Sequence, residues 1–117
     1  MLKVGLIGVG GISGAHIPGW LALDDVELVA LCDVRPEQME KYSDIRHYTD
    51  FDDMLANETL DILDICLPTN LHADYAIKAM NNGINVLCES RFHLIVMMLN
   101  VFMPLPKKTM LSLWWLT

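Results

Sequence analysis

The first residues whose types and spacing suggest chemistry are the glycines in the run Lys-Val-Gly-Leu-Ile-Gly-Val-Gly-Gly-Ile-Ser-Gly, residues 3–14. Gly8 would permit a tight turn after an apolar strand, and Gly10, which has no Cβ, would let the backbone approach a pyrophosphate. The N–H groups and the positive dipole end of the following helix would then face the phosphates. Ser13 takes the third small position, although Gly14 beside it leaves the register open. The run predicts a dinucleotide-binding loop, with a plain strand–turn–helix as the alternative.

An acidic residue ends the second predicted strand. Asp33 follows the apolar run Val-Glu-Leu-Val-Ala-Leu-Cys, residues 26–32. A carboxylate at this place accepts hydrogen bonds from the ribose 2′-hydroxyl of an adenine nucleotide, and it would repel a 2′-phosphate. Arg35 lies two residues on and is suited to a 2′-phosphate, so the choice between NAD and NADP stays open. A solvated turn or a helix cap is the alternative role of Asp33.

Strand-like runs and helical stretches alternate around these residues. Strands are predicted over residues 4–9, 26–32, 47–49, 61–67 and 85–88, and helices over residues 12–23, 36–43, 52–56 and 70–82. Pro18 and Gly19 predict a kink or a broken turn in the first helix. Asp50 is the expected N-cap of the third helix, and Gly83 the residue after the fourth. The alternation predicts a Rossmann-type α/β fold, a doubly wound parallel sheet in the order 3-2-1-4-5.

The polar and flexible residues of this predicted sheet follow its strands. In an open parallel sheet, ligands bind beyond the carboxyl ends of the strands, where the strand order reverses. Four segments stand at those ends, namely residues 8–11, 33–35, 67–72 and Glu89. We expect these segments to converge on one crevice.

The composition excludes several kinds of partner. A net charge of −7 does not favour a nucleic-acid surface. The apolar stretch over residues 92–105 is too short and too interrupted to span a membrane. The cysteines form no C-x-x-C pair and lie in apolar runs, which predicts buried, reduced thiols and a cytoplasmic protein; they are Cys32, Cys66 and Cys88. The histidines have no metal-ligand spacing, so no metal site is predicted; they are His16, His47, His72 and His93.

Four motifs in one order resemble a known family. They are Val-Gly-Leu-Ile-Gly-Val-Gly-Gly-Ile (4–12), Ala-Leu-Cys-Asp (30–33), Asp-Ile-Cys-Leu-Pro-Thr-Asn-Leu-His (64–72) and Gly-Ile-Asn-Val-Leu-Cys-Glu (83–89). With these motifs, residues 3–89 resemble the N-terminal nucleotide-binding half of glucose–fructose oxidoreductase and inositol 2-dehydrogenase relatives, the Gfo/Idh/MocA family.

The resemblance implies NAD or NADP as cofactor, and a sugar or polyol substrate in full-length relatives. Residues 67–72 would lie along the nicotinamide, and Glu89 would begin a Glu-Lys-Pro motif whose lysine handles the proton of the reacting group. The implied catalytic residues are His72 and Glu89. Together with the glycine loop and Asp33, the predicted cofactor-binding residues are Gly8, Gly10, Gly11, Ile12, Ser13, Asp33, Arg35, Leu67, Pro68, Thr69, Asn70, His72 and Glu89. For the last four the alternatives are helix capping, a place in the first turn of a helix, and an ordinary charged strand end.

The resemblance ends after Glu89. Ser90-Arg91-Phe92 follows, where the family has Lys-Pro, and all 15 acidic residues lie at or before Glu89. Loss of one A converts GAA AAG CCG A into GAA AGC CGA, which turns Glu-Lys-Pro into Glu-Ser-Arg. The other frame of the tail permits a charged helix followed by an apolar strand.

We therefore interpret the chain as a frameshifted oxidoreductase product. Residues 1–89 would be the Rossmann domain and residues 90–117 an apolar out-of-frame tail, with residues 94–99 its most aggregation-prone window. The C-terminal substrate domain would be absent and the Rossmann domain incomplete. Without the motif lysine and a substrate pocket, we expect little or no catalysis.

Two functions from other classes stay as alternatives. The first is a non-catalytic nucleotide-binding or sensing module that uses its tail to form a homo-oligomer. The second is an S-adenosylmethionine methyltransferase, which also places glycines after the first strand and an acid after the second. Methyltransferases usually carry an acidic residue leading into the glycine loop, whereas residues 3–7 of this chain contain none.

Overall fold

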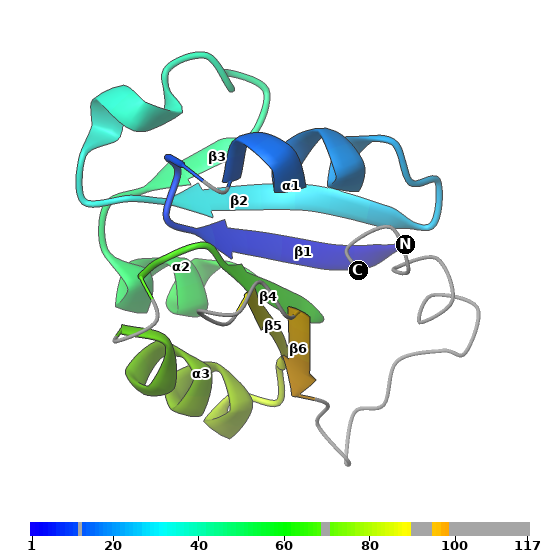
Figure 1. Cartoon of the computed structure of the whole chain (residues 1–117), viewed down its shortest axis with the longest axis vertical. Helices are drawn as coiled ribbons and strands as arrows, with labels where there is room; N and C mark the ends of the chain where they lie inside the picture. Colours follow the sequence, from blue (N-terminus) through cyan, green and yellow to red (C-terminus); the bar gives the residue numbers. More distant parts are fainter. Residues whose placement is uncertain (12, 69–70, 90–94, 99–117) are drawn as a thin grey trace.

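A computed structural model describes residues 1–11, 13–68, 71–89 and 95–98 of the chain (Figure 1). In chain order its elements are β1 (Leu2–Ile7), α1 (Ser13–Leu21), β2 (Val26–Cys32), the 3₁₀ helix η1 (Pro36–Met39), β3 (Arg46–Tyr48), α2 (Phe51–Asn57), β4 (Ile62–Ile65), α3 (His72–Asn81), β5 (Asn85–Glu89) and β6 (Ile95–Met98). They form one sheet in the order β3-β2-β1-β4-β5-β6.

The sheet is doubly wound about β1. From β1 the chain moves through β2 to β3 on one side, and through β4 to β5 on the other, with these five strands all parallel. The predicted order 3-2-1-4-5 is therefore confirmed. Ile7 at the end of β1 pairs with both Cys32 and Ile65, so β1, β2 and β4 end at the same level. The segments that follow these three strands consequently start side by side at one edge of the sheet.

Each face of the sheet carries its own apolar core. On one face α1 packs Ile17 and Trp20 against residues of β1, β2 and β4. On the other face α2 and α3 cover the sheet with Phe51, Met54 and two alanines. Figure 1 shows α1 on the opposite side of the strands from α2 and α3. Burial on both faces explains why β1, β2 and β4 read as nearly continuous apolar runs.

The first helix differs from its prediction. α1 runs from Ser13 to Leu21 through Pro18 and Gly19, so the predicted broken turn is absent, while the alternative, a kink, stays a prediction. Proline lacks the N–H that would bond to the carbonyl four residues earlier, here that of Gly14. That bond is missing inside the helix, but the later bonds from the Ala22 N–H to the carbonyls of Pro18 and Gly19 still form.

The predicted length of the second helix is also wrong. Only Pro36–Met39 is helical, as the 3₁₀ turn η1, and not residues 36–43. The chain then continues in single turns, because the Tyr42 N–H donates to the Met39 carbonyl and the Ile45 N–H to the Tyr42 carbonyl. The fully buried Met39 side chain anchors this segment to the core.

The helix ends on the other face follow their local signals more closely. The Asp50 carboxylate accepts a bond from the Asp52 N–H and caps α2, as predicted. Gly83 follows α3 with a φ of 78°, as expected of a residue that ends a helix. However, α3 begins at His72 rather than at residue 70, and its N-cap, Leu71, makes no side-chain capping bond.

The parallel pattern ends at β5. β6 lies antiparallel to β5, with Glu89 paired to Ile95 and Val86 to Met98. This reversal falls where the acidic residues cease, and sequence analysis did not predict a strand there. Most of residues 90–117, and His93 among them, lies outside the described part of the chain. Among the helices of the described residues, none combines the length and apolar composition needed to cross a membrane.

Candidate dinucleotide-binding site

The turn after β1 requires glycine at position 8. Gly8 has a φ of +94°, a conformation that other residues rarely adopt. A Cβ at this position would lie 2.8 Å from the Cys66 carbonyl oxygen and 2.9 Å from the Leu67 Cδ2 atom. The Gly8 N–H donates to the Cys32 carbonyl, and the Cys66 N–H to that of Ile7. The backbones that follow β1, β2 and β4 therefore meet at Gly8.

The next glycines face open space instead. Among the described residues, a Cβ on Gly10 would meet only the Gln38 Oε1 atom, at 3.8 Å, and one on Gly11 would meet nothing within 4 Å. A hollow of about 270 Å³ adjoins this loop; it is lined by Val9, Gly10, Gly11, Ser13, Gly14, Gln38, Lys41 and Tyr42. The Ser13 and Gly14 N–H groups donate to the Gly10 and Gly11 carbonyls at 3.2 Å, which are long hydrogen bonds. The glycines thus present backbone without side chains to a concave surface, which suits a pyrophosphate.

Asp33 ties the second strand end to this loop. Its Oδ2 atom accepts from the Val9 N–H at 2.8 Å, and its Oδ1 atom from the Arg35 N–H at 2.9 Å. A carboxylate offers about four lone-pair sites, so these two bonds leave acceptor capacity for a ribose diol. Asp33 is partly exposed and the Arg35 residue is exposed.

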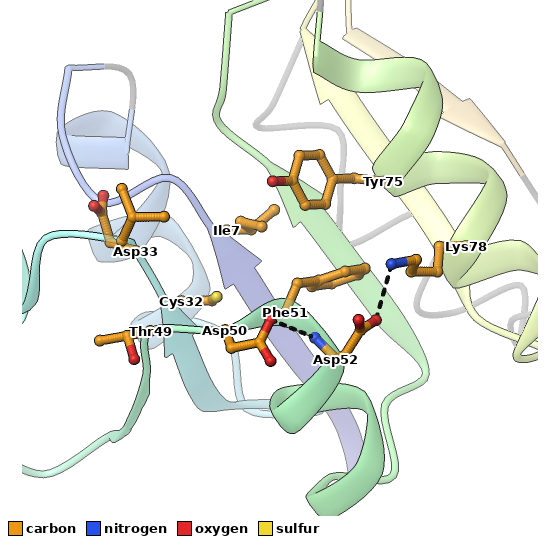
Figure 2. Close-up of a pocket in the computed structure, with 10 residues that line it drawn as sticks. Ile7, Cys32, Asp33, Thr49, Asp50, Phe51, Asp52, Tyr75 and Lys78 are labelled. Carbon is orange, nitrogen blue, oxygen red and sulfur yellow. Dashed lines mark hydrogen bonds and ion pairs between the residues drawn. The ribbon is translucent and has the colours of Figure 1, made fainter.

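A second pocket, of about 170 Å³, lies beside Asp33 on the α2/α3 side of the sheet (Figure 2). Its walls come from the ends of β1, β2 and β3, the start of α2, and α3; they are Ile7, Cys32, Asp33, Val34, Thr49, Asp50, Phe51, Asp52, Tyr75 and Lys78. Three of these are carboxylates, and the one cation, Lys78, bonds Asp52 at 2.9 Å. The exposed fraction of Val34 is 80%, which places an apolar side chain at the rim.

His72 is turned toward its own loop. It is buried, and its Nε2 atom lies 2.5 Å from the Leu67 carbonyl oxygen. A carbonyl only accepts hydrogen bonds, so Nε2 carries a proton in this contact. The bond closes the segment that joins β4 to α3. Thr69 and Asn70 lie outside the described residues, as does Ile12 of the glycine loop.

The structure brings most predicted site residues to one edge. The residues after β1 are Gly8, Gly10, Gly11 and Ser13. Asp33 and Arg35 follow β2, and Leu67, Pro68 and His72 follow β4. Glu89 is the last residue of β5. No ligand contact tests these assignments, so the catalytic and cofactor-binding roles stay predictions.

Several pocket residues were not found from the sequence. Lys41 and Tyr42 reach the glycine loop because the chain between β2 and β3 folds over it, and Tyr75 and Lys78 come from α3. No local pattern distinguishes these residues from other surface positions. Only the topology places them beside the strand ends.

None of the three cysteines, all of which lie in the described residues, forms a disulfide, and all three are buried, as predicted. Burial raises the pKa of the Cys32 thiol to about 12, with smaller contributions from Asp33 and Asp50. Burial also raises the pKa of Cys88 above its ordinary value. Because the thiolate is the nucleophile, these two cysteines are unsuited to covalent chemistry.

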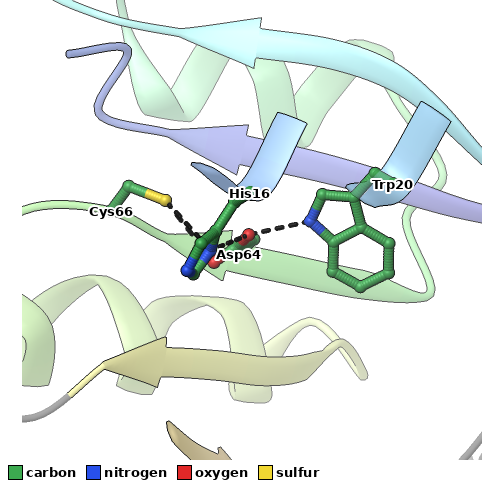
Figure 3. Close-up of polar contacts among 4 residues, drawn as sticks. All are labelled: His16, Trp20, Asp64 and Cys66. Carbon is green, nitrogen blue, oxygen red and sulfur yellow. Dashed lines mark hydrogen bonds and ion pairs between the residues drawn. The ribbon is translucent and has the colours of Figure 1, made fainter. Parts of the chain in front are cut away.

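One buried polar cluster was also missed. His16, Asp64 and Cys66 place their ligand-type atoms within 4.8 Å of one another, beneath α1 (Figure 3). Histidine spacing alone could not reveal this group, because Asp64 comes from β4 and Cys66 directly follows that strand. The acid in the middle of an apolar strand was the available signal. The absence of a metal site stays a prediction.

Comparison with known proteins shows which family has this architecture. Residues 2–90 match the family model for Gfo/Idh/MocA, described as an oxidoreductase family with an NAD-binding Rossmann fold. The chain is 33% identical over 92 residues to the 4-carboxy-2-hydroxymuconate-6-semialdehyde dehydrogenase of Sphingobium sp., covering 75% of this chain and 29% of that protein. It is 30% identical over 94 residues to the inositol 2-dehydrogenase of Salmonella typhimurium, covering 75% of this chain and 28% of that one.

A solved structure shows the same likeness in three dimensions. The WlbA dehydrogenase from Bordetella pertussis, in complex with NADH and UDP-GlcNAcA, superposes with a TM-score of 0.72 at 34% identity, covering 76% of this chain and 29% of that one. The chain thus spans less than a third of the length of these relatives. The predicted nicotinamide cofactor is confirmed at the level of the fold. From residue 2 to residue 90, the chain belongs to the Gfo/Idh/MocA oxidoreductase family and carries its NAD-binding Rossmann fold.

Proposed function

We propose that this chain binds one nicotinamide dinucleotide across the carboxyl edge of its sheet, as the cofactor-binding part of an oxidoreductase. The observation that carries the proposal is the open hollow in front of Gly10 and Gly11, where added Cβ atoms would meet almost none of the described residues. The pyrophosphate would occupy this hollow. Lys41 lines it and would partly neutralise the phosphate charge.

The adenosine end would lie in the pocket beside Asp33, with the apolar Val34 and the Tyr75 ring near the base. Asp33 would accept hydrogen bonds from the ribose hydroxyls while it still holds the Val9 N–H. Asp33, Asp50 and Asp52 together make this pocket acidic. A 2′-phosphate would be repelled, and we therefore propose that NAD(H) is preferred over NADP(H).

A nicotinamide dinucleotide supplies hydride transfer when bound. The residues of this chain would bind and orient it, with His72 holding the loop that follows β4. We propose a sugar or polyol hydroxyl, or the corresponding carbonyl, as the substrate class of the whole enzyme, in line with the inositol dehydrogenase among its relatives. Ser90 stands where the family motif has its lysine, so we propose weak turnover at most for this sequence. Three buried cysteines without a disulfide support the cytoplasm as the compartment.

Cofactor titration tests this proposal. We expect saturable binding of NADH, weaker binding of NADPH, and no binding of S-adenosylmethionine. Asp33→Ser should reduce the preference for NADH by about tenfold, which corresponds to about 1.4 kcal/mol. Asp44→Ser makes the same change in charge at an exposed turn outside both pockets and should leave the preference unchanged. Equal affinity of the wild-type chain for NADH and NADPH would contradict the proposed role of the acidic pocket.

A further inference from the structure

A fully buried carboxylate lies in the middle of the sheet. Asp64 is on β4 between Leu6 of β1 and Leu87 of β5, and its exposed fraction is 0%. A charged group in such surroundings is unfavourable unless hydrogen bonds compensate for the lost water. Asp64 therefore requires donors, and a position inside an apolar strand calls for a reason other than packing.

Both principal donors come from α1 (Figure 3). The His16 Nδ1 atom lies 2.7 Å from Asp64 Oδ2, and the Trp20 Nε1–H donates to the same oxygen at 2.8 Å. His16 and Trp20 are four residues apart, so they lie one above the other on the same helix face. The Cys66 thiol donates to the Oδ1 atom over a longer 3.6 Å. One carboxylate thus holds two successive turns of the helix.

The amino-acid composition of α1, the helix that Asp64 contacts, disfavours helix formation. In its nine residues α1 contains Gly14, Pro18 and Gly19, and its first turn has no acidic residue. Glycine and proline disfavour helix, so tertiary contacts must fix its position. α1 also follows the glycine loop directly, and its first N–H groups bond to the Gly10 and Gly11 carbonyls. A shift in the position of α1 would therefore also shift the glycine loop.

We propose that Asp64 anchors α1 through His16 and Trp20 and so positions the glycine loop for the dinucleotide. His16 and Trp20 are then positioning residues that never touch the ligand. The inference rests on the proposed function for its ligand. It goes beyond that function by assigning part of the affinity to buried side chains on the sheet side of the helix.

The hydrogen-bond geometry favours an anchor over a metal site. A separation of 2.7 Å between Nδ1 and Oδ2 fits a shared proton. Two ligand atoms each about 2.0–2.1 Å from a tetrahedral zinc ion would lie farther apart than that. The indole N–H of Trp20 can only donate, so a metal bound at Oδ2 would compete with it.

Three variants and one matched control test the anchor. His16→Leu and Trp20→Phe remove a donor but keep apolar bulk, whereas His16→Asn keeps a donor close to the Nδ1 position. Ile17→Val changes a buried, purely apolar contact of the same helix. We expect His16→Leu and Trp20→Phe to weaken NADH binding about tenfold, or 1.4 kcal/mol, and His16→Asn and Ile17→Val to stay within about twofold of wild type.

Hydrogen exchange of the backbone amides of residues 9–14, measured without cofactor, supplies a readout independent of ligand. Exchange should accelerate in His16→Leu but not in Ile17→Val when both are compared at equal global stability. Unchanged loop exchange in His16→Leu would overturn the anchor, and so would stoichiometric Zn²⁺ binding that Cys66→Ser abolishes. A folded wild-type chain that fails to bind NADH would instead overturn the proposed function.

Discussion

Gly8→Ala should destabilise the fold through two separable effects. Alanine must adopt the φ of +94°, which costs about 1–2 kcal/mol for a residue with a Cβ. The new methyl group would also lie 2.8 Å from the Cys66 carbonyl oxygen, which is backbone and cannot rotate away. Relieving such an overlap costs about 1–3 kcal/mol. The free energy of unfolding should therefore fall by about 2–5 kcal/mol, out of the roughly 5–15 kcal/mol typical of a domain.

Urea unfolding followed by circular dichroism measures this loss. Gly14→Ala is the matched control, because a Cβ there meets nothing within 4 Å in the part of the chain that the structure describes, and the residue lies in α1. It should be neutral or should stabilise by up to about 1 kcal/mol, the helix preference of alanine over glycine. If Gly8→Ala unfolds within about 0.5 kcal/mol of wild type, as an ordinary surface substitution would, the argument from the left-handed turn is refuted.

Four further predictions follow from other parts of the molecule. The Arg46 guanidinium, paired with the nearly buried Glu58 carboxylate at 2.6 Å, holds the pKa of Glu58 below its ordinary 4.5. Because the folded-state pKa of Glu58 is lowered, the pair stabilises the fold above about pH 4.5 and loses this contribution as the pH falls through the folded-state pKa. Arg46→Met should thus be less stable than wild type at pH 7. In acid, the urea midpoints of the variant and the wild type should converge. Lys41→Met should weaken NADH binding about threefold at low salt, and a difference that persists at 1 M NaCl, where charges are screened beyond about 3 Å, would argue against an electrostatic role. Cys32 should resist iodoacetamide at pH 8 in the folded chain and react after unfolding, since a pKa of about 12 leaves almost no thiolate; fast labelling of the native protein, detected by mass spectrometry, would contradict its burial. Sequencing the coding DNA across the Glu89 codon should show one A missing from the predicted run and a long second reading frame behind it; an intact run would refute the frameshift.

The strands and their order could be predicted because their signals are local. Apolar runs such as that of β2 end at polar residues, and the alternation with helical stretches leaves few topologies. Asp33 was predicted in the same way, as the acid that ends β2. Its two backbone hydrogen bonds could not be predicted, because they depend on how close the glycine loop comes to the end of β2.

The helices were less predictable because tertiary contacts override composition. Pro18 indicates a break, yet α1 continues, and its packing on the sheet and its bonds to Asp64 account for that. Residues 36–43 resemble a helix in composition, but the segment turns to bury Met39 and to bring Lys41 beside the glycine loop. The course of these two segments depends on contacts with residues that are distant in the sequence, and a single sequence does not reveal those contacts.

The most direct test of the account is calorimetric titration of the chain with NADH, beside Gly10→Ala. Among the described residues, the nearest atom to a Cβ on Gly10 would be the Gln38 Oε1 atom at 3.8 Å, so this variant should fold as stably as wild type. The same Cβ would project into the space assigned to the pyrophosphate. We predict one saturable NADH site in wild type and at least about tenfold weaker binding in Gly10→Ala, a loss of about 1.4 kcal/mol or more. Equal binding by both proteins would contradict the central claim that the cofactor lies against this loop.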